Sequence, residues 1–332
     1  MNQKNIAKKI ISTIYIGGGT PSIINENFIN QILISIRTKY TITESCEITI
    51  EANPDDINYK KLRSWKKFGI NRISLGVQSF NDIILKSLNR NHNSITAISS
   101  IDKIKNLFTN YSIDLMFGTP NSNYKTISND LNKIKEISPP HISIYNMTVE
   151  KNTVIEKQLK KKKIFLPDEN IIMDHFDNIH SFMEEIGYNN YEISSYCKEG
   201  FQSEHNSNYW KNKSYIGFGP GAHSYDKKFR YWNISDNNLY IYKLKNNENV
   251  FSKEKLTIQN KINEYIITRI RTSTGINLDE LEKNFNINLY IKKNLEIDSM
   301  VKSMLLKKSN KNIKLTNKGK KVIDHITTKI MI

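Results

Sequence analysis

Glycines and hydroxyl-bearing residues follow the first strand-like run of the chain, in a pattern that suits binding of a small ligand. The run Tyr15-Ile16 leads into Gly17-Gly18-Gly19-Thr20-Pro21-Ser22. Glycines at the carboxyl end of a strand leave backbone N–H and C=O groups uncovered, so a ligand can approach the main chain closely. Pro21 and Ser22 then begin the next segment as a helix start does. Taken alone, this run fits a glycine-rich turn without a ligand equally well.

Four further strand-like runs also end in polar residues. Their ends are Glu51-Ala52-Asn53-Pro54, Gly76-Val77-Gln78-Ser79-Phe80, the segment from Asp114 to Pro120, and Tyr145-Asn146. Each end alone fits a turn or a helix cap. Five polar ends in succession would fill a core poorly, however, and the carboxyl ends of parallel strands meet at one edge of a sheet. The sequence therefore predicts a site at that edge for a polar, zwitterionic ligand with hydroxyl groups.

The elements that would position these residues alternate between strand and helix. From residue 13 to about residue 195, strand-like and helix-like segments follow one another in units of about 30 residues, as in repeated βαβ units. Amphipathic helices are expected at 28–37 and 58–68. Strands are expected at Thr13–Ile16, Glu47–Glu51, Arg72–Val77, Ile113–Phe117, His141–Tyr145 and Tyr191–Ser194. This order predicts an α/β fold with a parallel sheet and outer helices, as a complete or a partial barrel.

Composition narrows the class of protein. The 332 residues are 38% hydrophobic, and no long uncharged apolar run or signal peptide is evident, so a cytoplasmic location is expected. Two cysteines, Cys46 and Cys197, are too few for a disulfide framework or a cysteine metal site. The net charge of +16 comes from lysines spread along the whole chain. It therefore gives no ground for a nucleic-acid partner.

The segment from Gln202 to Tyr225 is dense in aromatic residues and glycines, and it contains His205 and His223. Such segments can line a pocket for a flat aromatic ligand, because ring faces stack and imidazole can bind a metal. On chemistry alone, hydrogen bonding is the commoner role of a lone histidine in a loop.

Helices are expected in the last part of the chain at Ile258–Thr272, Leu278–Phe285 and Ile291–Lys302, followed by a hairpin with a basic tip. This order has the outline of a winged-helix module, which raises nucleic-acid binding as a third class of function. The helix near Ile291 alternates lysines with acidic residues, however, and is not a basic recognition face.

Five motifs in order resemble a known family. They are Tyr-Ile-Gly-Gly-Gly-Thr-Pro-Ser (15–22), Glu-Ala-Asn-Pro (51–54), Gly-Ile-Asn-Arg-Ile-Ser-Leu-Gly-Val-Gln-Ser-Phe (69–80), Asp-Leu-Met-Phe-Gly-Thr-Pro (114–120) and Pro-Pro-His-Ile-Ser (139–143). The chain resembles the radical S-adenosylmethionine (SAM) family of oxygen-independent coproporphyrinogen III oxidases and their relatives, and in particular its HemW branch of heme chaperones.

The resemblance implies a fold and a division of the chain. Residues 1–195 would form a partial (β/α) barrel of radical SAM type that lacks its first strand. Residues 196–249 would form an aromatic and histidine-rich connecting region that completes the sheet face, and residues 250–332 a winged-helix-like α/β domain.

The resemblance also implies SAM and heme as ligands. Gly18, Gly19 and Thr20 match the residues that meet the amino group of SAM, and three further positions match its polar ligands: Glu51, Gln78 and Asp114. Arg90 suits its carboxylate group. The run from His205 to Trp210 matches the His-Asn-x-x-Tyr-Trp motif of the HemW branch, which implies heme binding by His205, Asn206, Tyr209 and Trp210, with His205 as an iron ligand.

One feature of the family does not match. The family holds a [4Fe–4S] cluster with a Cys-x-x-x-Cys-x-x-Cys loop upstream of the glycine-rich run, and one iron of the cluster binds SAM. Here sixteen residues precede Gly17, and none is a cysteine. Three explanations stay open: a true start upstream of Met1, a degraded gene, or a heme carrier that works without a cluster.

The function implied by the resemblance is therefore a heme chaperone rather than an enzyme. It would bind heme and pass it to heme-accepting proteins, for which respiratory proteins and a peripheral association with the membrane are the expected setting. The alternative is an oxygen-independent coproporphyrinogen III oxidase-like radical SAM enzyme, if the true start lies upstream, or a degraded remnant of either. The oligomeric state stays open.

Overall fold

The computed structural model describes residues 10–332, and the chain divides into two compact units. The first unit ends at His205 and the second begins at Asn206. The three-part division expected from the resemblance stays a prediction.

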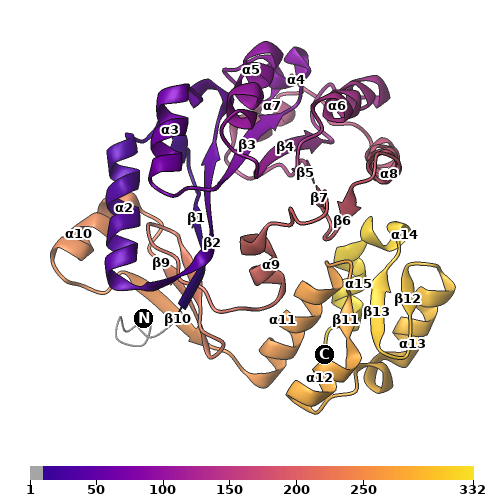
Figure 1. The fold of residues 1–332 in the computed structure, drawn as a ribbon. Helices are drawn as coiled ribbons and strands as arrows, with labels where there is room; N and C mark the ends of the chain where they lie inside the picture. Colours follow the sequence, from indigo (N-terminus) through magenta and orange to yellow (C-terminus); the bar gives the residue numbers. More distant parts are fainter. Residues whose placement is uncertain (1–9) are drawn as a thin grey trace. The chain divides into compact units, whose positions relative to one another are not determined.

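A seven-stranded sheet forms the centre of the first unit, with the strand order β1-β2-β3-β4-β5-β7-β6 (Figure 1). The first five strands pair in parallel, whereas β7 pairs antiparallel with both β5 and β6. The bounds are β1 Ile10–Ile16, β2 Thr41–Ala52, β3 Arg72–Gln78, β4 Tyr111–Phe117, β5 His141–Asn146, β6 Asn189–Asn190 and β7 Ser195–Cys197. The first five expected strands are confirmed, and each is longer than expected.

The sixth expected strand is wrong. Residues 191–194 form the turn that joins β6 to β7, two strands of two and three residues. The side-chain amide of Asn190 donates to the carbonyl oxygens of Glu192 and Ser195 at 2.6 and 3.1 Å. These bonds hold the backbone in a turn, although β-branched and aromatic residues there favour a strand.

Helices of the first unit lie between consecutive strands of the chain, from β1 to β6 (Figure 1). Helices expected at 28–37 and 58–68 are confirmed as α2 and α3. Asparagine side chains accept hydrogen bonds from backbone N–H groups at the starts of α2, α3, α4, α5 and α6, as N-caps do. The bounds are η1 Pro21–Ile23, α2 Glu26–Lys39, η2 Pro54–Asp56, α3 Tyr59–Lys67, α4 Asp82–Ser87, α5 Ser94–Lys105, α6 Tyr124–Ile137, α7 Val154–Lys160 and α8 Glu169–Glu185.

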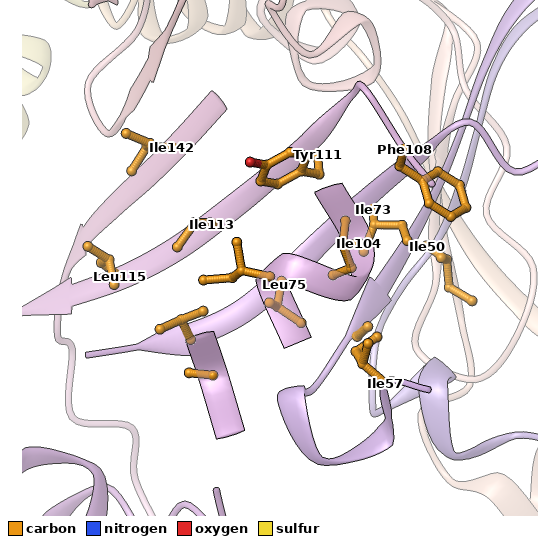
Figure 2. Packing of buried hydrophobic residues seen from close by; sticks show 14 of the residues in the cluster. Ile50, Ile57, Ile73, Leu75, Ile104, Phe108, Tyr111, Ile113, Leu115 and Ile142 are labelled. Atoms are coloured by element: carbon orange, nitrogen blue, oxygen red, sulfur yellow. The ribbon is translucent and has the colours of Figure 1, made fainter. Parts of the chain in front are cut away.

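The core of the first unit fills the space between these helices and one face of the parallel strands, which we call the outer face. Figure 2 shows Ile73 and Leu75 of β3 beside Ile113 and Leu115 of β4, with Ile104 of α5 close by. All five side chains are at most 3% exposed. Burying such side chains stabilises the fold by about 1.5–3 kcal/mol each, so this face fixes the sheet against its helices.

The second unit begins within a short helix, α9 Glu204–Trp210, which runs across the division between the units. A three-stranded antiparallel sheet follows, in the order β10-β9-β8, with α10 between β9 and β10. The bounds are β8 His223–Tyr225, β9 Phe229–Asn233, α10 Asn237–Lys245 and β10 Phe251–Lys255.

The last part of the second unit has its own apolar core and a second three-stranded sheet, in the order β11-β13-β12. The three helices expected there are confirmed, and β12 and β13 form a hairpin as in a winged helix. The bounds are α11 Ile258–Ile270, β11 Ile276–Asn277, α12 Leu278–Phe285, α13 Leu289–Lys302, β12 Leu306–Lys308, β13 Asn312–Leu315, α14 Asn317–Lys320 and α15 Ile323–Ile330. Over residues 10–332, no helix combines the length and apolarity that crossing a membrane requires.

Candidate functional site

The face of β1–β5 opposite the helices, which we call the inner face, is polar. Side chains alternate between the two faces of a strand, and the inner-face positions carry hydroxyl, carboxylate, guanidinium and imidazole groups. Parallel strands are usually apolar on both faces, so this alternation marks an interior built for polar chemistry. The inner-face residues are Thr13, Tyr15, Glu47, Thr49, Glu51, Arg72, Ser74, Gly76, Gln78, Ser112, Asp114, His141 and Ser143.

A cavity of about 210 Å³ lies where β1–β4 end. Six of the seven residues that the resemblance implies for SAM line it. The lining residues are Gly19, Thr20, Pro21, Glu51, Ala52, Asn53, Ser74, Gly76, Gln78, Arg90 and Asp114. The seventh residue, Gly18, donates its backbone N–H to Glu51 Oε2 at 3.2 Å. The structure therefore brings these residues together, while their contact with a ligand stays a prediction.

Glu51 organises the glycine-rich end of β1. Its Oε1 accepts a hydrogen bond from the hydroxyl of Tyr15 at 2.8 Å, while Oε2 accepts from Gly18. A Cβ atom on Gly17 would lie 2.7 Å from the Tyr15 ring and 2.9 Å from Glu51 Oε1, closer than real contacts allow. Gly18 has a φ of 110°, in the region that favours glycine, and Gly19 faces open space. Packing against the Tyr15 and Glu51 side chains therefore favours glycine at 17, the backbone conformation favours it at 18, and Gly19 leaves the main chain open.

Two charged side chains at the cavity have shifted pKa values. Asp114 accepts hydrogen bonds from Ser74 at 2.8 Å and Ser112 at 3.0 Å, yet burial raises the pKa of its carboxyl group. Burial also lowers the pKa of Arg90, whose Nη1 donates to Asn53 Oδ1 at 3.3 Å. An anionic group in the cavity would offset the cost of burying this guanidinium.

His205 lies against the inner face, on the first turn of α9. Its Nδ1 is 2.9 Å from the hydroxyl oxygen of Thr13, and its ring stacks on Tyr15 with centroids 4.8 Å apart. Glu47 accepts hydrogen bonds from the backbone N–H groups of Glu204 at 3.0 Å and His205 at 2.9 Å. Burial lowers the pKa of His205, which favours the neutral imidazole that binds metals.

The other three residues of the His-Asn-x-x-Tyr-Trp run belong to the second unit. The ring of Tyr209 meets that of Tyr215 edge to face, with centroids 4.7 Å apart, and Tyr215 lies 6.1 Å from Tyr225. The indole Nε1 of Trp210 is buried without a hydrogen-bond partner in the part of the chain that the structure describes. Asn206 is partly exposed.

The cysteines do not form a cluster site. Cys46 lies in β2 and Cys197 in β7; both are free and buried, and burial raises the pKa of each thiol to about 11. Within residues 10–332, no three His, Cys, Asp or Glu side chains are grouped so that they could hold a metal ion. The residues present therefore do not fit a three-thiolate [4Fe–4S] site.

The inner-face residues that do not lie at strand ends were not predicted as site residues from the sequence. Thr13, Tyr15, Glu47, Arg72 and His141 come earlier in their strands. The signal was present in the sequence as polar residues at every second position, as in Glu47-Ile48-Thr49-Ile50-Glu51.

Comparison with known proteins agrees with this architecture. Residues 2–134 match the family model of the radical SAM superfamily. The heme chaperone HemW of Buchnera aphidicola subsp. Schizaphis graminum is 34% identical to this chain, and the match covers 97% of this chain and 84% of that HemW. The chain belongs to the HemW family. HemW of Lactococcus lactis subsp. lactis is also similar, 30% identical over 97% of this chain and 85% of its own.

The fold has a counterpart among solved structures. Coproporphyrinogen III oxidase (HemN) from Escherichia coli superposes with a TM-score of 0.85, covering 99% of this chain and 80% of HemN at 21% sequence identity. This likeness shows that the HemW family chain has the radical SAM fold.

Proposed function

We propose that this protein is a heme chaperone that binds heme through His205 and passes it to recipient proteins. The observation that carries the proposal is the His-Asn-x-x-Tyr-Trp run on α9, whose histidine lies on the polar inner face of the sheet. The proposal is supported by the HemW family membership, since relatives over nearly the whole chain are named heme chaperones.

The chemistry of the run suits a porphyrin that is held and later released. A neutral imidazole can ligate heme iron, and aromatic rings such as Tyr209 and Trp210 offer faces to a flat macrocycle. A single histidine ligand with aromatic contacts makes no covalent bond to the porphyrin, so heme can leave for a recipient.

We also propose SAM as a ligand of the cavity at the strand ends. Bound to a cluster, SAM supplies radical chemistry, for which this chain has no three-thiolate site. The described residues would hold SAM itself: Arg90 its carboxylate, backbone groups at Gly18, Gly19 and Thr20 its amino group, and Glu51, Gln78 and Asp114 its hydroxyl groups and sulfonium side.

The same proposal implies partner proteins and a cellular location. Heme-accepting proteins, with respiratory proteins as the first candidates, would be the partners. Peripheral contact with the membrane would suit delivery to them. Two free, buried cysteines are in keeping with a cytoplasmic location.

Heme titration tests the proposal. Adding the purified protein to heme should shift the Soret band saturably. His205→Ala should weaken heme binding by more than about tenfold, because removing an iron ligand costs more affinity than removing a residue that supports the ligand. His325→Ala, on the exposed side of α15, is the matched control and should bind as the wild type does.

Three results would overturn the proposal. The first is the absence of a Soret shift in the wild type, and the second is equal binding by the wild type and His205→Ala. The third is anaerobic decarboxylation of coproporphyrinogen III by the purified chain, which would favour an oxidase.

A further inference from the structure

We propose that Thr13 and Glu47 are positioning residues for His205: Thr13 fixes the imidazole ring, and Glu47 fixes the main chain that carries it. This inference rests on the proposed heme-binding function of His205. No motif in the sequence marks either residue.

Thr13 controls the ring. Its hydroxyl oxygen lies 2.9 Å from Nδ1 of His205, from a strand 192 residues earlier in the chain. When Nδ1–H donates to this oxygen, Nε2 carries the lone pair that can face iron. A partner on one ring nitrogen thus sets both the orientation of the imidazole and the nitrogen that ligates, as the hydrogen-bond partners of metal-binding histidines do.

Glu47 controls the backbone. Its carboxylate accepts hydrogen bonds from the N–H groups of Glu204 and His205, and the hydroxyl of Ser203 lies 3.4 Å from Oε1. The N–H groups of a first helical turn have no partner within the helix, and α9 has only seven residues. Such a short helix has little stability of its own, so the carboxylate anchors the turn that carries His205.

The contacts of Thr13 and Glu47 with His205 come from neighbouring positions on two paired strands. Thr13 and Glu47 are paired in the register of the parallel strands β1 and β2, and both belong to the inner face. The ring and the main chain of His205 are therefore held by a single rigid element. Residues on paired strands keep their spacing better than residues on loops, which suits the precise placement of a ligand.

A simpler role for Glu47 would be to neutralise Arg72. Glu47 does lie beside this buried arginine, because Arg72 Nε is 3.9 Å from Glu47 Oε2, near enough for charge attraction but beyond hydrogen-bonding distance. Nε and Nη2 of Arg72 are buried without hydrogen-bond partners among residues 10–332. The hydrogen bonds of Glu47, which is 7% exposed, go to α9, so Glu47 anchors the helix in addition to pairing with the charge of Arg72.

The experiment compares heme binding by four variants of the full chain, with hemin as the probe. Thr13→Val keeps the shape and deletes the hydroxyl, whereas Thr13→Ser keeps the hydroxyl. Glu47→Gln removes the charge at nearly constant volume. Thr49→Val is the matched control, because Thr49 is the next inner-face residue of β2 and its buried hydroxyl has no hydrogen-bond partner among the described residues.

Thr13→Val and Glu47→Gln should each weaken hemin binding about tenfold, as loss of a supporting residue of a metal ligand does, and should shift the Soret maximum. Thr13→Ser and Thr49→Val should retain the wild-type affinity and spectrum. The Soret maximum reports the iron ligand itself, so a merely structural role would lower affinity or stability without moving it.

Wild-type affinity and spectrum in both Thr13→Val and Glu47→Gln would overturn the inference, provided that His205→Ala has lost binding. Equal binding by His205→Ala and the wild type would instead overturn the proposed function. A thermal unfolding measurement shows whether Glu47→Gln folds. If it does not fold, the comparison of hemin binding by Thr13→Val and Thr13→Ser tests the inference on its own.

Discussion

On the outer face of β1–β5, isoleucine, leucine and valine side chains pack against helices, whereas the inner face of the same strands carries carboxylates, hydroxyls, an arginine and a histidine. The outer face supplies the stability that burial of apolar surface gives. The inner face buries polar groups, which costs free energy unless each finds a partner. The contrast teaches that one alternating pattern supplies both the apolar face that stabilises the sheet and the polar face that forms the candidate site. Substitutions on the two faces should therefore change the free energy of unfolding by different amounts.

Neighbouring residues of β3 should show the largest contrast. Leu75 on the outer face is 0% exposed, and Leu75→Ala should lower the free energy of unfolding by about 2–5 kcal/mol, because it leaves a cavity. Ser74→Ala on the inner face deletes one hydrogen bond to Asp114 and should cost about 1 kcal/mol. Urea denaturation of both variants measures the difference, and equal losses would refute the assignment of the two faces.

His141 should make stability fall in acid. Burial lowers the pKa of this inner-face imidazole well below its usual value, and both ring nitrogens have partners, Ser112 and Tyr191, at 2.8 Å. Because the pKa of this imidazole is lower in the folded protein than in the unfolded chain, the unfolded chain binds a proton first. The folded protein therefore keeps its full stability above the unfolded-chain pKa of about 6.5 and loses stability as the pH falls below it. The loss reaches about 1.4 kcal/mol per pH unit.

Urea denaturation at pH 7, 6 and 5 checks this prediction. His141→Gln should remove about one proton from the pH dependence of unfolding. His325→Gln, at an exposed position, is the control for the substitution of a histidine as such. An unchanged slope in His141→Gln would contradict the expected effect of burial.

Asp114 should act in the opposite direction. Burial raises the pKa of this carboxyl group, so the stability that it contributes is full below its usual pKa of 3.8 and is lost as the pH rises through the raised value. Asp114→Asn should therefore gain stability relative to the wild type as the pH is raised from 4 to 7. Unfolding free energies at both ends of this range test the sign, and a difference that does not vary with pH would disprove it.

The smallest effect concerns the two cysteines. Cys46 and Cys197 are at most 4% exposed, and burial raises the pKa of each thiol to about 11, so the reactive thiolate is scarce at pH 8. Neither should react with a thiol reagent until the protein unfolds, whereas Ser45→Cys, on the exposed residue next to Cys46, should add one fast-reacting thiol. Rapid labelling of native wild-type protein would argue against the buried positions.

Much of the fold and part of the site could be predicted from the sequence. Five strands and the helices between them follow from local periodicity, and the residues implied for SAM meet at one cavity because parallel strands end at one edge. The turn at 191–194 was missed because the side-chain hydrogen bonds of Asn190 outweigh strand propensity there. The neighbours of His205 were missed because no local pattern reports a partner 192 residues away.

The sequence by itself determined the alternation of the strands, the polar strand ends and the run that makes His205 a candidate ligand. These features depend on nearest neighbours along the chain, because successive side chains in a strand point to opposite faces of the sheet. Only the tertiary structure decided that Thr13, Tyr15 and Glu47 surround His205. Register between strands and the packing of α9 onto them are set by many contacts at once, so they exist only when the chain has folded.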